Sequence, residues 1–164
     1  MAKQNESKKE KANSDLTEKV LHINRCSKVV KGGRKFSFSA LILVGDGKGR
    51  VGCGFAKANE LTDAIRKGGE SARKQMVSYP KYNDSVPHEV TADCDGAKLL
   101  LKPAPDGAGV IAGSQVRVVL EMAGYKNVMA KSLGSSNPIN QVRAVLKALS
   151  SLHTREQIRL TRGI

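Results

Sequence analysis

The sequence predicts an α+β fold in which strands precede a helix twice along the chain. Extended runs that alternate apolar and polar residues, typical of half-buried strands, fill much of 25–57 and return over 88–102. After each group, apolar residues recur at helical spacing. A hydrophobic fraction of 40% in 164 residues is enough for a core, in one domain or in two small ones that share an interface.

We expect four parts along the chain. Residues 1–15 are polar, mixed in charge and poor in apolar side chains, which predicts a mobile tail. Two prolines and several turn formers in Tyr79–Pro87 predict a boundary between a first domain over 16–80 and a second over 86–151. Residues 152–164 are expected to form a basic, partly helical tail.

The first domain is expected to hold three antiparallel strands, separated by glycine turns at Lys31–Arg34 and Gly45–Arg50. The third strand presents Gly52, Gly54 and Ala56 on one face. Because these side chains are so small, a helix or an RNA backbone could approach that face closely.

A helix is predicted after these strands, over about 60–78, with Asn59 as its N-cap. Gly68 and Gly69 fall in its middle, where each costs about 1 kcal/mol relative to alanine. Either close packing on the sheet compensates for this cost, or the helix is weak there.

The second domain opens with a hairpin whose strands, 88–94 and 97–102, are joined by Asp95-Gly96, a strong signal for a two-residue turn. The remaining expected elements are a helix near 113–123 that closes at Gly124, a short strand over 127–131, and a long helix capped by Asn137 with Pro138 at its first position.

The charge of the chain indicates a polyanionic partner. Its 28 Lys and Arg exceed its 15 Asp and Glu, for a net charge of +13. Such a surplus steers a protein toward nucleic acid and releases counterions on binding. With no Trp, three Tyr and three Phe, aromatic side chains are scarce, which favours recognition of backbone and shape over the stacking of single-stranded bases.

The strongest functional signal is the basic turn around Gly32 and Gly33. Two glycines allow positive φ and a close approach to a surface, and the neighbouring cations supply phosphate contacts, so we interpret this turn as an RNA contact rather than a solvated loop. The cations are Lys28, Lys31, Arg34 and Lys35. Lys48 and Arg50 repeat the pattern more weakly at the second turn.

Other classes of function find little support. Gly47–Gly52 matches G-x-G-x-x-G, but the residues after it alternate like a strand, so the helix that a dinucleotide site needs is missing. Neither the three histidines nor Cys26, Cys53 and Cys94 have metal-ligand spacing, and no catalytic motif stands out. We therefore expect no enzyme, metal or cofactor. Without a membrane span or a signal peptide, we expect a soluble, cytoplasmic protein.

For two segments the sequence allows both a structural role and a binding role. Asp106–Gly113 could form an anion-binding nest, or it could be a tight connection or a protein contact. Asn137 is first a helix cap, but with Lys131 and Arg143 nearby it could also meet RNA or a neighbouring protein.

Six segments then stand in a recognisable order: Asn24–Arg34, Phe36–Phe38, Val44–Gly52, Gly109–Gly113, Arg117–Gly124 and Gly134–Asn140. Over about 16–150 the chain closely resembles the bacterial form of the fifth protein of the small ribosomal subunit. The resemblance implies a first domain similar to double-stranded-RNA-binding domains, with a three-stranded antiparallel sheet and a helix, and a second two-layer domain of βαβ type.

The resemblance also implies a function: a structural protein that binds small-subunit rRNA and supports translational accuracy. The implied partners are ribosomal proteins four and eight of the small subunit, and messenger RNA near the channel by which it enters. The segment Arg25–Arg34 would lie near the spectinomycin pocket, and Gly109 and Arg117 would face protein four. The full set of expected RNA-binding residues is Arg25, Lys28, Lys31, Gly32, Gly33, Arg34, Lys35, Phe36, Lys48, Arg50, Lys57, Lys131, Asn137 and Arg143.

Two other classes of protein remain as alternatives to a ribosomal protein. A free-standing regulator or chaperone that binds double-stranded RNA would show the same basic hairpin. An enzyme would have to use the glycine turn or the second domain for a nucleotide.

Overall fold

A computed structural model describes residues 16–163 and shows two four-stranded sheets with helices packed on them. The expected tail 1–15 lies outside the described residues. The α+β class is confirmed. The elements of the first half are β1 (Thr17–Val30), β2 (Gly33–Gly45), β3 (Arg50–Ala58), α2 (Leu61–Lys74) and β4 (Val77–Ser78). Those of the second half are β5 (Val90–Cys94), β6 (Ala97–Pro103), β7 (Val110–Ile111), α3 (Ser114–Met122), β8 (Val128–Gly134), α4 (Pro138–Ser150) and α5 (Arg155–Arg162).

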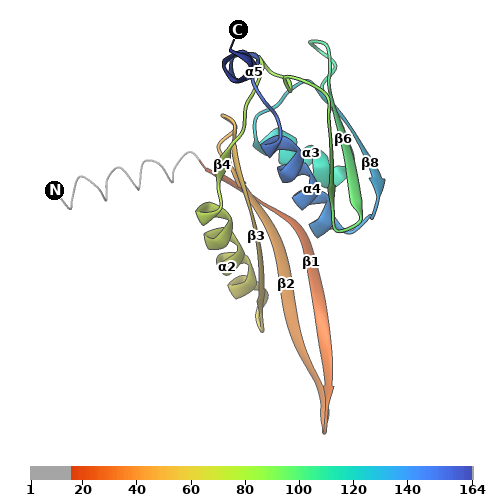
Figure 1. Ribbon diagram of the computed structural model, residues 1–164. Coiled ribbons are helices and arrows are strands. Elements are labelled where there is room, and N and C mark those ends of the chain that lie inside the picture. Colours follow the sequence, from red (N-terminus) through yellow and green to blue (C-terminus); the bar gives the residue numbers. More distant parts are fainter. Residues whose placement is uncertain (1–15, 164) are drawn as a thin grey trace, which may run out of the picture.

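The first sheet has the antiparallel order β1-β2-β3-β4. Its three long strands are the predicted ones, and the two-residue β4 is an addition. Val30 pairs with Gly33, so β1 and β2 are joined by a two-residue turn, and Gly32 and Gly33 take φ of +105° and +152°. The β1–β2 hairpin projects beyond all other elements, at the lower end of Figure 1.

Helix α2 covers the glycine face of β3, which decides between the two predicted occupants of that face. A Cβ placed on Gly54 would stand 2.0 Å from the backbone oxygen of Gly68. The helix and the strand therefore touch backbone to backbone, and the face is closed to RNA. Gly68 in mid-helix is explained by its own contact with the sheet: a Cβ there would stand 2.8 Å from Cδ1 of Ile42, and this close packing compensates for the low helix propensity of glycine.

The bounds predicted for this helix were partly wrong. Its N-cap is Glu60, whose side chain makes no capping hydrogen bond, and Asn59 lies one residue outside. The helix ends at Lys74 and not near residue 78, because the chain turns there to pair β4 with the start of β3.

The second sheet has the order β5-β6-β8-β7, with α3 and α4 on one face. The predicted turn joins β5 to β6, with φ of +47° at Asp95 and +80° at Gly96. Strands β7 and β8 are parallel and connected through α3, which confirms the βαβ unit. The caps expected at Gly124 and Asn137 are present as well.

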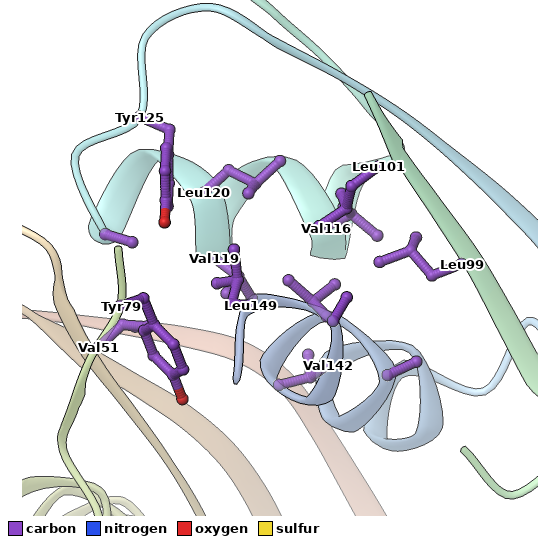
Figure 2. Close-up of a cluster of buried hydrophobic side chains, with 14 of the residues drawn as sticks. Val51, Tyr79, Leu99, Leu101, Val116, Val119, Leu120, Tyr125, Val142 and Leu149 are labelled. Atoms are coloured by element: carbon purple, nitrogen blue, oxygen red, sulfur yellow. The ribbon is translucent and has the colours of Figure 1, made fainter. Parts of the chain in front are cut away.

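One hydrophobic cluster joins the two halves of the molecule. Leu41 and Leu43 of β2 belong to the same buried cluster as the apolar faces of α3 and α4. Figure 2 shows Val51 and Tyr79 of the first half facing residues of these two helices. The end of the first sheet near the β2–β3 turn is therefore fixed against the second half, while the end with the β1–β2 turn is left free.

Buried tyrosines reinforce this junction. Tyr125 is 2% exposed, and its hydroxyl donates a hydrogen bond to the backbone oxygen of Pro80 at 2.9 Å. Burial raises the pKa of both Tyr125 and Tyr79 above the ordinary tyrosine value. Cys53 packs against the same cluster, and burial raises its thiol pKa to about 11, in keeping with the apolar role expected for it.

Candidate RNA interface

The two basic turns lie at opposite ends of the first sheet. The turn at Lys31 precedes β2 and the turn at Lys48 follows it, and β2 has 13 residues. At about 3.4 Å per residue, the two turns are about 40 Å apart. They therefore cannot contact the same phosphate group and would form separate sites.

The β1–β2 hairpin is exposed on both faces along its outer half. Every residue of β1 from His22 to Val29 is exposed, as are residues 31–36. Apart from the adjacent residues, no atom of residues 16–163 lies within 4 Å of a Cβ placed on Gly32 or Gly33. From Lys19 to Gly45 the sequence contains no Asp or Glu. The tip thus combines positive charge with free space around the backbone.

Cross-strand register sorts the expected hairpin residues onto two faces. Ser27 pairs with Phe36 and Val29 with Arg34, so one face bears Arg25, Arg34 and Phe36. The guanidinium carbon of Arg25 lies 3.8 Å from the centroid of the Phe36 ring. This stacking holds the cation in place and leaves its edges free to donate hydrogen bonds.

The opposite face of the hairpin carries three lysines. Lys28 pairs directly with Lys35, and Lys57 of β3 pairs with Ser39 on the same side. Like charges directly opposite each other destabilise a free hairpin. A polyanion removes that repulsion, so cations on two faces suit insertion between phosphate backbones.

The second basic turn is largely structural. Asp46 accepts hydrogen bonds from the amides of Lys48 and Arg50 at 2.8 and 3.0 Å, and its carboxylate pairs with the Arg50 side chain at 2.7 Å. Burial alone raises the pKa of Asp46, but these hydrogen bonds and the Arg50 charge bring it below the ordinary value. Part of the positive charge expected at this turn is therefore already neutralised.

This second turn also packs against the second half. The amide of Gly47 donates to the carbonyl of Met122 at 3.0 Å, and a Cβ placed on Gly124 would collide with the backbone of Gly47. The G-x-G-x-x-G match thus lies in a hairpin turn and is followed by β3, and no helix begins there.

The loop 106–113 is a tight connection. The amides of Gly107 and Gly109 both donate to the side-chain oxygen of the buried Asn127, at 3.2 Å each. Because these two amides are already used, the nest that an anion would need is filled by the protein itself. Arg117, which follows on α3, is exposed.

The remaining expected residues are spread over the second half. Lys131 pairs with Leu100 on the sheet face that no helix covers, whereas Arg143 on α4 lies 3.5 Å from the carboxylate of Asp95. Asn137 caps α4 by accepting a hydrogen bond from the amide of Ile139 at 3.1 Å. The start of α4 and Arg143 both lie at the β5–β6 turn, where Asn140 donates to the carbonyl of Asp95 at 2.7 Å, whereas Lys131 lies on the opposite face of the sheet.

Replacing Asn137 tests its capping role in α4. Asn137→Ala is expected to lower the free energy of unfolding by about 1 kcal/mol, because one amide at the start of α4 loses its acceptor. Asn137→Ser keeps an acceptor and should stay within a few tenths of a kcal/mol of the natural chain. Urea unfolding followed by circular dichroism measures both. Equal stability of the two variants would contradict the capping role.

Sequence reasoning missed one group of cations. Arg155, Arg159 and Arg162 are exposed on α5, where the sequence predicts only a basic, partly helical tail. Their spacing of four and three residues, just after a Thr-x-x-Gln capping signal, could have identified a basic helix face.

Within residues 16–163, no group of three or more His, Cys, Asp or Glu could hold a metal ion. No helix in the described part of the chain is long and apolar enough to cross a membrane.

Comparison with known proteins gives consistent matches. Residues 16–80 match the family model described as ribosomal protein S5, N-terminal domain, and residues 92–162 match ribosomal protein S5, C-terminal domain. The chain is 73% identical over 167 residues to small ribosomal subunit protein uS5 of Protochlamydia amoebophila, covering 100% of both chains. It is 67% identical to that of Chlamydia felis, over 93% of each chain, and 63% identical to that of Chlamydia pneumoniae, over 96% of this chain and 95% of the relative.

Proposed function

Since the chain belongs to the ribosomal protein S5 family and is a structural, non-enzymatic constituent of the small ribosomal subunit in the cytoplasm, we propose that its β1–β2 hairpin binds the small-subunit rRNA. The hairpin tip fits between phosphate backbones, where Arg25, Lys28, Lys31, Arg34 and Lys35 neutralise charge. Gly32 and Gly33 let the backbone approach the RNA closely. The protein thereby holds RNA segments in a fixed geometry.

The single observation that supports this proposal best is the projecting hairpin. It carries cations on both faces and no carboxylate from Lys19 to Gly45, and its outer half packs against nothing else in the described chain. An exposed strand pair with paired lysines has no evident structural purpose in the isolated protein. Lys57 extends the same basic face, while Lys48 and Arg50 would make a weaker contact at the other end.

We further propose that the second half contacts neighbouring proteins. The open face of its sheet exposes Ile111, Met129 and Leu133 at 50%, 43% and 44%, and such apolar groups favour a protein partner. Ribosomal proteins four and eight of the small subunit are the proposed partners, with Gly109 and Arg117 toward protein four. A position near the channel by which messenger RNA enters would connect these contacts to translational accuracy.

The same proposal divides the chain at 80–86, so that 16–80 works as the RNA-binding domain and 86–151 as the protein-binding one. Asn137 and Arg143 would then add RNA contacts at the start of α4 and near Asp95, and Lys131 would add one between Met129 and Leu133, beside the protein-binding surface. The shared hydrophobic cluster would fix the two domains relative to each other.

Sedimentation of a cell lysate tests whether RNA and protein contacts hold the chain in the small subunit. We expect the protein to migrate with the small subunit at moderate salt and to leave it only at salt well above physiological, because phosphate contacts weaken steeply with salt while protein contacts do not. Sucrose-gradient fractions are probed with an antibody against the chain. Migration near the top of the gradient at moderate salt would contradict the proposal and favour the free RNA-binding regulator.

A further inference from the structure

We propose that a groove between α5 and the segment 81–88 is a second RNA site, which binds a single-stranded segment by its phosphates and by one stacked base. This α5 groove has a volume of about 510 Å³. Its functional residues are Tyr82, Arg155, Arg159 and Arg162, and none of the described residues that line it is acidic. The inference rests on the proposed function only for the choice of RNA as the polyanion.

Three arginines supply the positive charge of the groove. Arg155, Arg159 and Arg162 are spaced four and three residues apart, which aligns them on one side of α5. All three are exposed, and no carboxylate within residues 16–163 lies within ion-pair distance of any of them. Guanidinium groups bind phosphate with two parallel hydrogen bonds, so a row of three suits a nucleic-acid strand.

Tyr82 supplies a stacking surface beside these cations. Its side chain is 62% exposed, and it opens a tight turn in which Tyr82 and Ser85 exchange two backbone hydrogen bonds of 3.0 Å. Lys81, the preceding residue, is held by the carbonyl of Gly124 and lies 5.6 Å from the Tyr125 ring centroid. The ring of Tyr82 therefore projects from a segment that is already held in place. A base can stack on it with little further loss of conformational entropy.

Helix α5 is positioned before any ligand arrives. Thr154 and Gln157 form a reciprocal capping box with bonds of 3.3 and 2.9 Å, and Gly163 closes the helix in the left-handed region at φ +69°. The amide of His153 donates to Nε2 of His88 at 3.1 Å, which ties the start of the helix to the segment 81–88. An isolated eight-residue helix would be unstable in water, so these local devices keep the basic face in place.

The combination of one exposed ring with several arginines favours a single strand over a duplex. Bases of a duplex are stacked on each other and cannot reach Tyr82, whereas an unpaired base can. Figure 1 places α5 at the end of the molecule opposite the β1–β2 tip, so the two RNA sites would hold separate segments. A protein that binds two segments fixes the distance between them.

The test measures binding of the full chain to a fluorescent oligouridylate of about twelve nucleotides, a length within the usual site size for single strands. A triple variant in which Arg155, Arg159 and Arg162 are each replaced by Gln is expected to bind the oligouridylate about tenfold more weakly. The plot of log K against log salt should also become less steep, by about 2 for the three arginines, since each phosphate neutralised on a single strand contributes about 0.7. Tyr82→Leu should reduce affinity about fivefold and Tyr82→Phe much less, because only Phe keeps a ring for stacking.

The matched control removes the same charge elsewhere in the second half, with Lys98→Gln, Lys102→Gln and Lys147→Gln. Equal losses in the α5 and control variants would overturn the inference, since binding would then follow net charge alone. So would equal affinities of Tyr82→Leu and Tyr82→Phe.

A cross-link readout separates this inference from the proposed function. An oligouridylate that contains 4-thiouridine should cross-link to the peptide that holds Tyr82. If that cross-link is absent while hairpin variants still lose rRNA binding, the α5 site fails and the proposed function stands. If the cross-link forms but hairpin variants bind rRNA normally, the proposed function fails and the α5 site stands.

Discussion

Reversing two charges at the hairpin tip, with Lys31→Glu and Arg34→Glu, is expected to weaken binding to small-subunit rRNA about 100-fold or more. Each phosphate contact is a charge-assisted hydrogen bond worth about 1.5–3 kcal/mol, and about 1.4 kcal/mol corresponds to a factor of ten. Two lost contacts also lower the salt dependence, by about 0.9 each in the slope of log K against log salt for a duplex. Small-subunit assembly should decline in parallel.

The fold should survive this double substitution. Both side chains are exposed, and surface changes of this kind alter stability by about 0.5 kcal/mol or less. Filter binding to rRNA and urea unfolding are measured on the same preparations. The control is Lys98→Glu with Lys102→Glu, which changes the net charge equally on the other sheet. Normal rRNA affinity of the hairpin variant, or an equal loss in the control, would refute the hairpin assignment.

Local patterns in the sequence were enough to predict most of the elements. Alternation of apolar and polar residues identified the three long strands of the first half, although burial does not follow that alternation: β1 has no buried residue, and the inner half of β2 is buried on both faces. Turns were predictable where the backbone needs a special conformation, as at Asp95-Gly96 with two positive φ values. The cap at Asn137 belongs to the same class, since its hydrogen bond spans only two residues.

What depends on distant contacts could not be predicted in this way. The glycine face of β3 was open to a helix or to RNA until the contact between Gly54 and Gly68 settled it. Asn59 was the predicted cap, but the helix is capped at Glu60 without a side-chain hydrogen bond, so the residue type at its start did not give its position.

In the candidate site, too, the features that depend on contacts between distant residues could not be predicted. Residue types and local charge identified both basic turns, and three consecutive antiparallel strands already put them at opposite ends of one sheet, but nothing in the sequence showed which turn is free. Only the structure shows Asp46 paired with Arg50 and the turn at Gly47 packed on α3, which makes that turn structural. The free projection of the other turn likewise follows from the position of the second half along the sheet.

Gly54→Ala is expected to destabilise the protein by about 3 kcal/mol or more, the upper end of the cost of overpacking. The added methyl group would stand 2.0 Å from the oxygen of Gly68 and 2.7 Å from the nitrogen of Ala72, so it would meet the backbone of α2 on the side where helix and strand touch. Backbone in a packed helix cannot rotate away as a side chain does. The helix must therefore move off the sheet as a unit, which disturbs the contacts of Ala64 with Ala40 and Ile42.

Gly69→Ala is the matched control, and its effect should have the opposite sign. Gly69 lies in α2 itself, and a Cβ there would be 3.3 Å from the carboxylate of Glu18, a half-exposed side chain that can shift. The gain in helix propensity, about 1 kcal/mol, should then raise the free energy of unfolding. Urea unfolding of both variants gives the comparison. Similar stabilities of the two variants would contradict a backbone contact between α2 and β3 at the glycines. A methyl group at Gly54, against helix backbone, would then have the same effect as one at Gly69, against a movable side chain.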